Sequence, residues 1–245
     1  MLKRDLAIRS GEGPDFDCFF VTPGNREARP AIVLASAIHG VDDDIRRIAE
    51  EFASAGYLAA APDLFWRTVP GPLDRDDPRA AERGRPRLER IKAGERDLAD
   101  VLQMLRRQPS FNGRAAVIGF CYGGPYAILA PRRLGYDAGI SCHGSQMLDF
   151  IEELAGVEGP VCLIWGDQDS LAPPAVLDAY RSLSSRTGNV AVHVLARVRH
   201  GYMMQASVNA YDQGAYDFSM SHALAVLESL RGDPPPAGAS RGKRP

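Results

Sequence analysis

The chain has 245 residues, of which 45% are hydrophobic and 24% are charged. These values are ordinary for a soluble globular protein and exclude a chain that is unfolded throughout, because unfolded chains combine few apolar residues with a high net charge. The formal net charge is only -2, so charge gives no reason to expect nucleic acid or an anionic membrane as the main partner.

The N-terminus and the cysteines bear on compartment and metal content. Asp5 lies within what would be the apolar region of a signal peptide. No stretch approaches the roughly 20 apolar residues that a membrane-spanning helix needs. The 4 cysteines lie far apart, without a Cys-x-x-Cys pair or a Cys/His cluster at zinc-ligand spacing. We therefore expect a cytoplasmic protein without a disulfide framework, a structural metal or a membrane association.

Short apolar runs rich in Val, Ile, Ala and Leu alternate with longer segments of helical periodicity, a pattern typical of a parallel sheet flanked by helices. The predicted strands are Asp17–Thr22 near an edge, Ala31–Ala37, Leu58–Ala61, Ala115–Gly119, Ala138–Cys142, Pro160–Trp165 and Val190–Leu195. Amphipathic helices are predicted over Asp43–Ala55 and Ile91–Arg106. The predicted fold class is therefore α/β.

Two segments lack periodicity. Residues 67–90 carry many Asp, Arg, Pro and Gly side chains and few apolar ones, so we expect a long, mobile loop, either a functional lid or a solvated surface excursion. Residues 231–245 contain Pro-Pro-Pro and several basic side chains, and we expect a disordered C-terminal tail. Nothing between indicates a domain boundary, so residues 1–230 are expected to form a single domain.

A candidate nucleophile follows the strand that ends at Gly119. The stretch from Gly119 to Gly123 reads Gly-x-Cys-x-Gly around Cys121, and an apolar helical segment, Pro125–Ala130, comes next. This resembles the nucleophile elbow of α/β-hydrolases, in which a sharp strand-to-helix turn requires small residues two positions before and after the nucleophile. A thiol at a helix N-terminus is also favoured as thiolate. The pattern predicts Cys121 as a nucleophile; the alternative is a buried, inert cysteine.

Such a nucleophile needs a carboxylate and then a histidine, each beyond a later strand. Asp167 and Asp169 follow the strand Pro160–Trp165, and His200 follows the strand Val190–Leu195. Because the loops after parallel strands meet at one edge of a sheet, these side chains can converge with the thiol. His200 is therefore the predicted base, with an aspartate that holds its ring.

The remaining histidines fit the base position less well. His193 falls inside a predicted strand and His222 inside a late helix. His39 and His143 follow strands and could line the same cleft, but neither follows the last strand. We expect these two to contact substrate rather than to act as the base.

Taken together, these motifs resemble the dienelactone hydrolase family. The resemblance also includes Ala59–Phe65, after the strand that starts at Leu58, and Gln108–Gly113, before the elbow strand. It spans about residues 15 to 230. The family consists of α/β-hydrolases with a Cys-Asp-His triad, so the resemblance implies a mostly parallel central sheet with helices on both faces.

The resemblance also implies roles for individual residues. Asp169 is preferred to Asp167 because the family's carboxylate comes three residues after a glycine, here Gly166. The implied catalytic residues are Cys121 as nucleophile, Asp169 as acid and His200 as base. The implied oxyanion hole consists of the backbone N–H groups of Ile38 and Tyr122.

Two positions depart from the family prototype. Ala37 stands where the prototype has a glutamate that contacts the resting cysteine, and Met204 stands where an arginine binds the substrate carboxylate. Another substrate-binding arginine of the family would fall within Arg75–Arg87. We therefore expect a substrate that is less anionic than dienelactone. Its expected contacts, unless these side chains belong to the core, are His39, Phe65, Trp66, His143, Tyr202 and Met204.

The predicted activity is hydrolysis of a small-molecule ester or lactone through a thioester acyl-enzyme, without a metal or cofactor. We expect a monomer or homodimer that binds neither nucleic acid nor membranes. Alternatives are an acyltransferase that uses the same groups, a non-catalytic binding protein on the same fold, and a redox-sensing thiol. The last two need no oriented imidazole, so the presence of both Asp169 and His200 argues against them.

Overall fold

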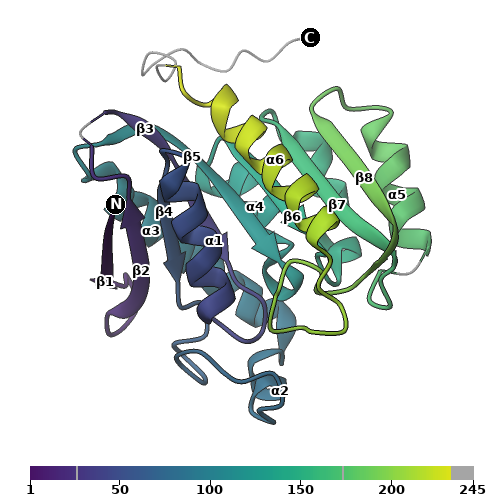
Figure 1. The fold of residues 1–245 in the computed structure, drawn as a ribbon, viewed down its shortest axis with the longest axis horizontal. Helices are drawn as coiled ribbons and strands as arrows, with labels where there is room; N and C mark the ends of the chain where they lie inside the picture. The colour runs from purple at the N-terminus through teal and green to yellow at the C-terminus, as the bar shows by residue number, and fades with distance from the viewer. Residues whose placement is uncertain (26, 173, 233–245) are drawn as a thin grey trace.

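The computed structural model describes residues 1–25, 27–172 and 174–232. Within them, an 8-stranded sheet has the order β1-β2-β4-β3-β5-β6-β7-β8 (Figure 1). The strands are β1 Leu2–Ile8, β2 Phe16–Thr22, β3 Arg29–Ala35, β4 Leu58–Pro62, β5 Phe111–Phe120, β6 Ala138–Cys142, β7 Val161–Gln168 and β8 Val190–Arg199. The pairs β1–β2 and β2–β4 are antiparallel, and all the others are parallel.

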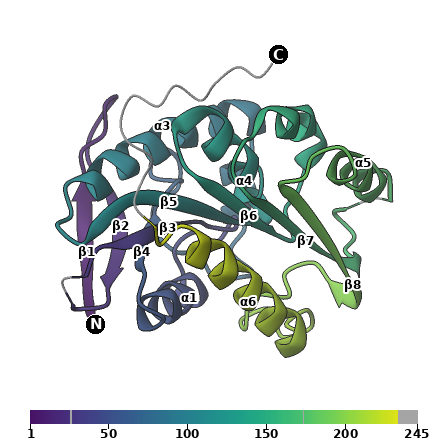
Figure 2. The same cartoon turned by 90° about the horizontal axis from the view of Figure 1, so that it is seen from above.

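Helices cover both faces of the sheet, which confirms the predicted α/β class. The α-helices are α1 Asp43–Ser54, α2 Ala80–Arg83, α3 Arg87–Arg106, α4 Tyr126–Leu129, α5 Pro174–Ser184 and α6 Gln213–Ser229. Shorter helical turns are η1 Cys121–Gly123, η2 Ala130–Leu134 and η3 Met147–Gly156. Figure 2 shows α1 and α6 on one face of the sheet and α3, α4 and α5 on the other.

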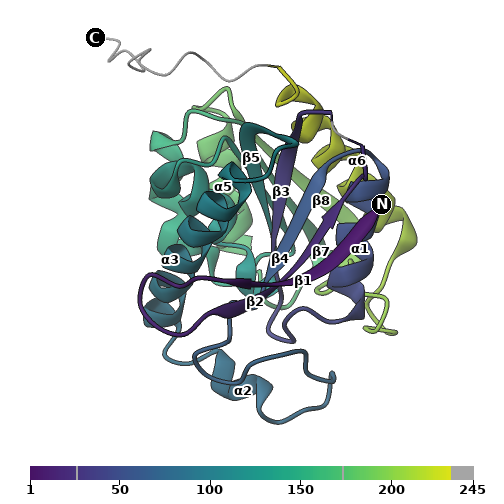
Figure 3. The same cartoon turned by 90° about the vertical axis from the view of Figure 1, so that its left-hand side faces the viewer.

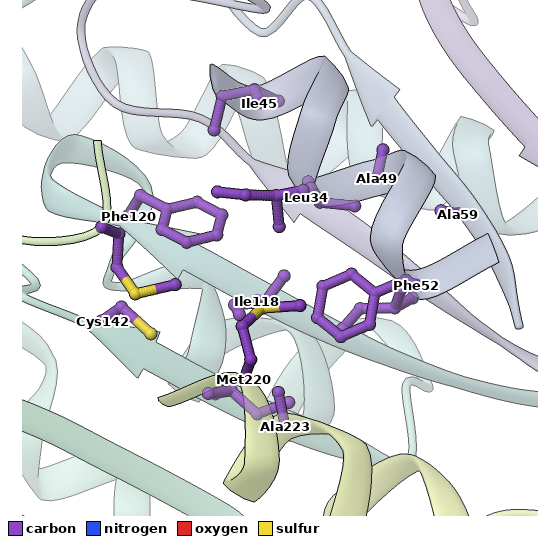
Figure 4. Close-up of a cluster of buried hydrophobic side chains, with 14 of the residues drawn as sticks. Leu34, Ile45, Ala49, Phe52, Ala59, Ile118, Phe120, Cys142, Met220 and Ala223 are labelled. Atoms are coloured by element: carbon purple, nitrogen blue, oxygen red, sulfur yellow. The ribbon is translucent and has the colours of Figure 1, made fainter. Parts of the chain in front are cut away.

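The core is divided by the sheet. Between the sheet and the pair α1 and α6, Phe52 and Met220 pack with Leu34 and Ile118 of the central strands (Figure 4). A large apolar side chain that is fully buried contributes about 1.5–3 kcal/mol relative to an exposed one. This packing holds β3 and β5 rigidly, and the loops that follow these two strands belong to the site described below.

Strand β1 has no counterpart among the predicted strands. It lies at the edge of the sheet, and most of its side chains are exposed. Two of them form ion pairs with α1, from Lys3 to Glu50 at 2.6 Å and from Asp5 to Arg46 at 2.8 Å. An edge strand that is stabilised by backbone pairing and surface charges has no apolar run, so hydrophobic periodicity does not reveal it.

The predicted loop 67–90 contains more structure than its composition indicates. It includes α2 and the first turn of α3, and it projects beyond one end of the sheet (Figure 3). The fully buried guanidinium of Arg83 donates hydrogen bonds to the carbonyl oxygens of Val69, Gly71 and Ile38. These contacts anchor the segment to the loop after β3. Its mobility stays a prediction.

The C-terminal end also differs in part from the predicted tail. Arg231 packs against the domain, with Nε 2.6 Å from Glu228 and 3.2 Å from the hydroxyl of Tyr57. The rest of the predicted tail, residues 233–245, lies outside the described residues. Among the described helices, none combines the length and the apolar character that crossing a bilayer requires.

Candidate active site

Cys121 occupies a strained turn between β5 and η1, with φ +48°. A Cβ at Gly119 would lie 2.1 Å from the carbonyl oxygen of Gly123, and one at Gly123 would lie 2.1 Å from the carbonyl oxygen of Ala35. Both contacts are sterically impossible, so the turn requires glycine at these positions. The local sequence thus positions the thiol at the carboxyl edge of the sheet, as the elbow pattern predicts.

Asp169 and His200 lie together beyond the ends of β7 and β8. The Nδ1 atom of His200 is 2.8 Å from Oδ2 and 2.9 Å from Oδ1 of Asp169. The Asp169 carboxylate is fully buried and also accepts a hydrogen bond from the N–H of Leu171. Asp167 instead is exposed and accepts a hydrogen bond from the N–H of Arg197. Of the two candidate acids, Asp169 is therefore the one that contacts the imidazole.

The thiol and the imidazole shift each other's ionisation. Burial opposes thiolate formation at Cys121, but His200 outweighs it, so the pKa of Cys121 lies below its ordinary value. Burial likewise opposes the imidazolium, but Asp169 and Cys121 raise the pKa of His200 to about 10. The Nε2 atom of His200 makes no hydrogen bond of ordinary geometry to a described residue. Such contacts are often loose before substrate binds.

The two other histidines predicted for the cleft occupy different environments. His143 is buried, its ring lies 4.9 Å from the ring of His200, and neither of its nitrogens has a described hydrogen-bond partner. Burial lowers its pKa far below the usual value, so the ring is neutral. His39 lies outside this contact, with Nδ1 2.8 Å from Nη1 of Arg75. The structure therefore brings His143, but not His39, against His200.

The two predicted oxyanion residues lie on loops that meet at Cys121. Tyr122 follows the thiol directly, and Ile38 follows β3, where Arg83 binds its carbonyl oxygen at 2.9 Å. The carbonyl oxygen of Cys121 accepts hydrogen bonds from the N–H groups of Gly124 and Ser145. Among the described turn and side-chain contacts, neither the Ile38 nor the Tyr122 N–H group donates a hydrogen bond. Both N–H groups therefore remain candidates for the oxyanion hole.

Most of the predicted substrate wall belongs to the core. Phe65, Tyr202 and Met204 are almost completely buried, and the Tyr202 hydroxyl is 2.8 Å from Oγ of Ser219. Trp66 stacks on Phe16, with 5.9 Å between ring centroids. These side chains pack against neighbouring elements, as the core alternative expects, and their contact with substrate stays a prediction.

Two residues beside Cys121 escape the sequence reasoning. Ser145 follows β6, and its Oγ lies 3.9 Å from the Sγ atom of Cys121. Arg87, the first residue of α3, donates from Nη2 to the carbonyl oxygens of Ser145 at 2.8 Å and Tyr122 at 3.3 Å. Side chains that follow the carboxyl end of a parallel strand are candidates for a binding cleft. This rule selects His143 from the sequence, and it applies equally to Ser145. Arg87 is the last residue of the range Arg75–Arg87, in which the resemblance places a substrate-binding arginine without fixing its position.

A cavity of about 360 Å³ adjoins these residues. Gly144 and Gln146, which flank Ser145, line it together with Leu171, the neighbour of the Asp169 loop. Its other lining residues are Met147, Leu148, Asp149 and Val176. It thus offers a space with both apolar and polar lining next to the loops that carry Ser145 and Asp169.

Comparison with known proteins places the chain in a family. The sequence matches the profile of the dienelactone hydrolase family over residues 16–230. The chain belongs to the dienelactone hydrolase family. It is 30% identical over 238 residues to a carboxymethylenebutenolidase of Pseudomonas putida, covering 96% of this chain and 100% of that protein. It is also 27% identical to carboxymethylenebutenolidase 1 of Cupriavidus pinatubonensis, covering 94% of this chain and 99% of that protein.

Solved structures of related proteins share the fold. A dienelactone hydrolase-like promiscuous phosphotriesterase from metagenomic libraries has a TM-score of 0.81 at 21% identity, over 94% of this chain and 99% of that one. A putative dienelactone hydrolase from Klebsiella pneumoniae has a TM-score of 0.76 at 21% identity, over 93% and 98% of the two chains. The fold is therefore that of the α/β-hydrolases. As a member of the dienelactone hydrolase family, the protein is a carboxylic ester or lactone hydrolase.

Proposed function

We propose that Cys121, Asp169 and His200 form the catalytic triad of this hydrolase. The Cys121 thiolate attacks the carbonyl carbon of an ester or lactone, and a tetrahedral intermediate forms. The N–H groups of Ile38 and Tyr122 hold its negative oxygen. In other acyl-transfer enzymes, the loss of one such donor costs about 3 kcal/mol.

The intermediate then collapses to a thioester. The carbon–oxygen bond of the ester breaks, and the His200 imidazolium gives its proton to the leaving alkoxide. Neutral His200 next takes a proton from water as the water attacks the thioester. The carbon–sulfur bond then breaks, the acid product leaves, and the Cys121 thiolate and the His200 imidazolium are restored. Asp169 keeps the imidazole in the required orientation throughout. Apart from the water molecule and the substrate, these proton transfers use only groups of the chain.

The observation that carries this proposal is the contact between Nδ1 of His200 and the carboxylate of Asp169, at 2.8 Å and 2.9 Å. It leaves Nε2, on the opposite side of the ring, to exchange a proton with Cys121. An imidazole fixed by a buried carboxylate, beside a thiol whose pKa is lowered, is the arrangement that nucleophilic catalysis requires. The candidate oxyanion N–H groups lie in the loop after β3, for Ile38, and in the turn of Cys121, for Tyr122.

The test is a panel of small neutral esters and lactones assayed with the wild type, Cys121→Ala and Cys162→Ala. Cys162 lies in β7 and serves as the control for the loss of a buried thiol. We expect Cys121→Ala to lose at least about 10³-fold in kcat/KM, and Cys162→Ala to stay within a few-fold. Rapid quenching and intact mass spectrometry of the wild type should show the acyl-enzyme. Full activity in Cys121→Ala would contradict the proposal, and transfer products with added alcohols would indicate an acyltransferase.

We further propose that the substrate is less anionic than dienelactone. The cavity beside the site is lined by Met147, Leu148, Leu171 and Val176, and its one charged lining residue is the acid Asp149. Position 204, where the resemblance implies a carboxylate-binding arginine, holds a buried methionine. A buried carboxylate without a paired cation is costly, so this lining favours a neutral, apolar group.

A further inference from the structure

Arg87 is a largely shielded cation without an acidic partner. None of the described carboxylates lies within salt-bridge distance of it, and its Nε atom is buried without a hydrogen-bond partner. Its hydrogen bonds go to neutral groups only, the carbonyl oxygens of Tyr122 and Ser145 and the hydroxyl of Ser145 at 3.4 Å. The guanidinium also lies 4.4 Å from the ring centre of Tyr122. A shielded cation of this kind normally needs an anion.

The surrounding groups leave Cys121 as the candidate anion. Burial lowers the pKa of Arg87, and the charged forms of Tyr122, Cys121, Tyr126 and Asp149 oppose that shift. Burial raises the pKa of Tyr122 to about 12 and that of Tyr126 still further, so both phenols are neutral near neutral pH. Asp149 forms no ion pair with Arg87. The Cys121 thiolate, which Ser145 connects to Arg87, is therefore the anionic partner that remains among the described residues.

Ser145 connects the two charges. Its hydroxyl lies 3.4 Å from Nη2 of Arg87 and 3.9 Å from the Sγ atom of Cys121. It can accept from the guanidinium while donating its own hydrogen to a thiolate. The N–H of Ser145 also binds the carbonyl oxygen of Cys121 at 2.9 Å, so the spacing between Arg87 and the thiol is fixed by the backbone.

We propose that Arg87 is the cation that keeps Cys121 ionised in the resting enzyme, as a thiolate paired with the His200 imidazolium. In the resting state, the thiol proton has moved from Sγ to Nε2 of His200, and Arg87 keeps its own proton throughout. The proposal rests on Cys121 being the nucleophile. Arg87 acts through the charge of the thiolate and is a positioning residue.

The other groups that face Cys121 are compatible with this state. His143, from the loop after β6, is neutral, and position 37, in the loop after β3, is an alanine. Asp169, from the loop after β7, faces the opposite side of the His200 ring. Arg90, also on α3, adds positive charge near Tyr122. A cation at a helix N-terminus opposes the helix dipole, so Arg87 at the start of α3 is not explained by helix stability.

The experiment measures the rate of Cys121 alkylation by iodoacetamide against pH, which follows the thiolate without any ester substrate. It compares wild type with Arg87→Gln, which can keep a hydrogen bond to the Ser145 carbonyl without the charge, and Arg87→Lys, which keeps the charge. Arg96→Met, an exposed α3 residue paired with Glu12, is the control. In Arg87→Gln, we expect the midpoint, the pH at which the alkylation rate of Cys121 is half-maximal, to rise by about one unit or more. Arg87→Lys and Arg96→Met should stay near the wild type.

Equal midpoints in wild type and Arg87→Gln would overturn the inference, as would equal shifts in Arg87→Lys and Arg87→Gln. If Arg87→Gln does not fold, Ser145→Ala takes its place, and it should shift the midpoint in the same direction by a smaller amount; no shift would again overturn the inference. The proposed function is tested separately by ester turnover in Cys121→Ala. An active triad whose thiol titrates independently of residue 87 would refute only the role of Arg87.

Discussion

At the scale of single residues, burial separates Cys121 from the other three cysteines. Burial raises the pKa of Cys142 and of Cys162 to about 12, and it raises that of Cys18 further. Of the four cysteines, only Cys121 has a thiol pKa below its ordinary value, because His200, Ser145 and Arg87 outweigh the effect of burial. The same residue type therefore has two chemical characters in one chain.

This difference predicts selective alkylation. At about pH 6, iodoacetamide should label Cys121 long before the other cysteines, because only a thiolate reacts at a useful rate. Peptide mapping by mass spectrometry identifies the labelled site. Preferential labelling of Cys18, Cys142 or Cys162 would contradict the assignment of Cys121 as the ionised thiol.

The two aspartates after β7 give a second prediction. Asp169→Asn should lower kcat by at least about 10²-fold, because an amide cannot hold the imidazole in its working tautomer. Asp167→Asn is the matched control, since Asp167 contacts the N–H of Arg197 and not the His200 ring. Steady-state kinetics of both variants decide the matter. A larger loss in Asp167→Asn would move the orienting role to that residue.

At the scale of elements, sequence patterns work where burial is continuous. The strand Ala138–Cys142 has the predicted bounds, and α1 ends one residue before the predicted Ala55. Parallel strands covered on both faces are apolar throughout, and helices packed on them have an apolar stripe. Strand β1 and segment 67–86 lack such patterns because their order depends on ion pairs and on the long-range contacts of Arg83. Sequence periodicity does not contain that information.

The candidate site divides in the same way. Cys121, Asp169 and His200 each follow a predictable strand and fit a local motif, so their convergence could be predicted. Arg87 and Ser145 meet only because α3 crosses the sheet near the loop after β6, with 2.8 Å between Nη2 and the Ser145 carbonyl oxygen. A contact between residues 58 positions apart without a motif requires the three-dimensional structure.

Segment 67–86 gives a third prediction. Arg83→Met should free the carbonyl oxygens of Val69, Gly71 and Ile38, and a lost hydrogen bond to a charged group costs about 1.5–3 kcal/mol. We expect faster proteolysis within the segment and a kcat lowered by about 10-fold, because the loop carrying the Ile38 N–H group loses its anchor. Limited proteolysis and kinetics check both effects.

Arg79→Met is the control for this variant, because Arg79 lies in the same segment but is exposed and pairs only with Asp77 among the described residues. It should leave the cleavage pattern and kcat near those of the wild type. If Arg83→Met resists the protease as the wild type does, Arg83 does not anchor the segment.

At the scale of the whole molecule, the sheet brings residues that are distant in sequence to one edge. The loops after β3, β5, β6, β7 and β8 meet there, and each contributes one part of the candidate site. The segment with α2 covers this edge through the contact of Arg83 with Ile38 at 2.9 Å. The charges of this covering segment are largely occupied. Arg83 binds carbonyl oxygens, and Arg75 pairs with Asp42 and Asp44 at 2.7 Å and 3.2 Å.

This distribution of charge predicts the substrate preference. An anionic ester would need a cation with free donors, but Arg75 and Arg83 are engaged, and Arg87 is proposed above to be paired with the Cys121 thiolate. The cavity beside the site contains an acid and no arginine or lysine among its lining residues. We expect kcat/KM for a neutral aryl or alkyl ester to exceed that for a matched ester with a free carboxylate by about 10-fold or more, because burying an unpaired carboxylate costs several kcal/mol. Parallel kinetics with the two esters measure the ratio.

The decisive variant adds a cation at the rim of the cavity without burying it. Leu148 lines the cavity and is 42% exposed, so Leu148→Arg should reduce the preference for the neutral ester by pairing with the carboxylate of the anionic one. Met204→Arg is unsuitable because it would place a charge at a position that is only 2% exposed. Val208→Arg, at an 87% exposed position outside the cavity, should leave the ratio unchanged. If the wild type prefers the anionic ester, the substrate proposal is wrong. In that case, loss of the preference in Arg87→Gln would identify Arg87 as the cation that binds the carboxylate.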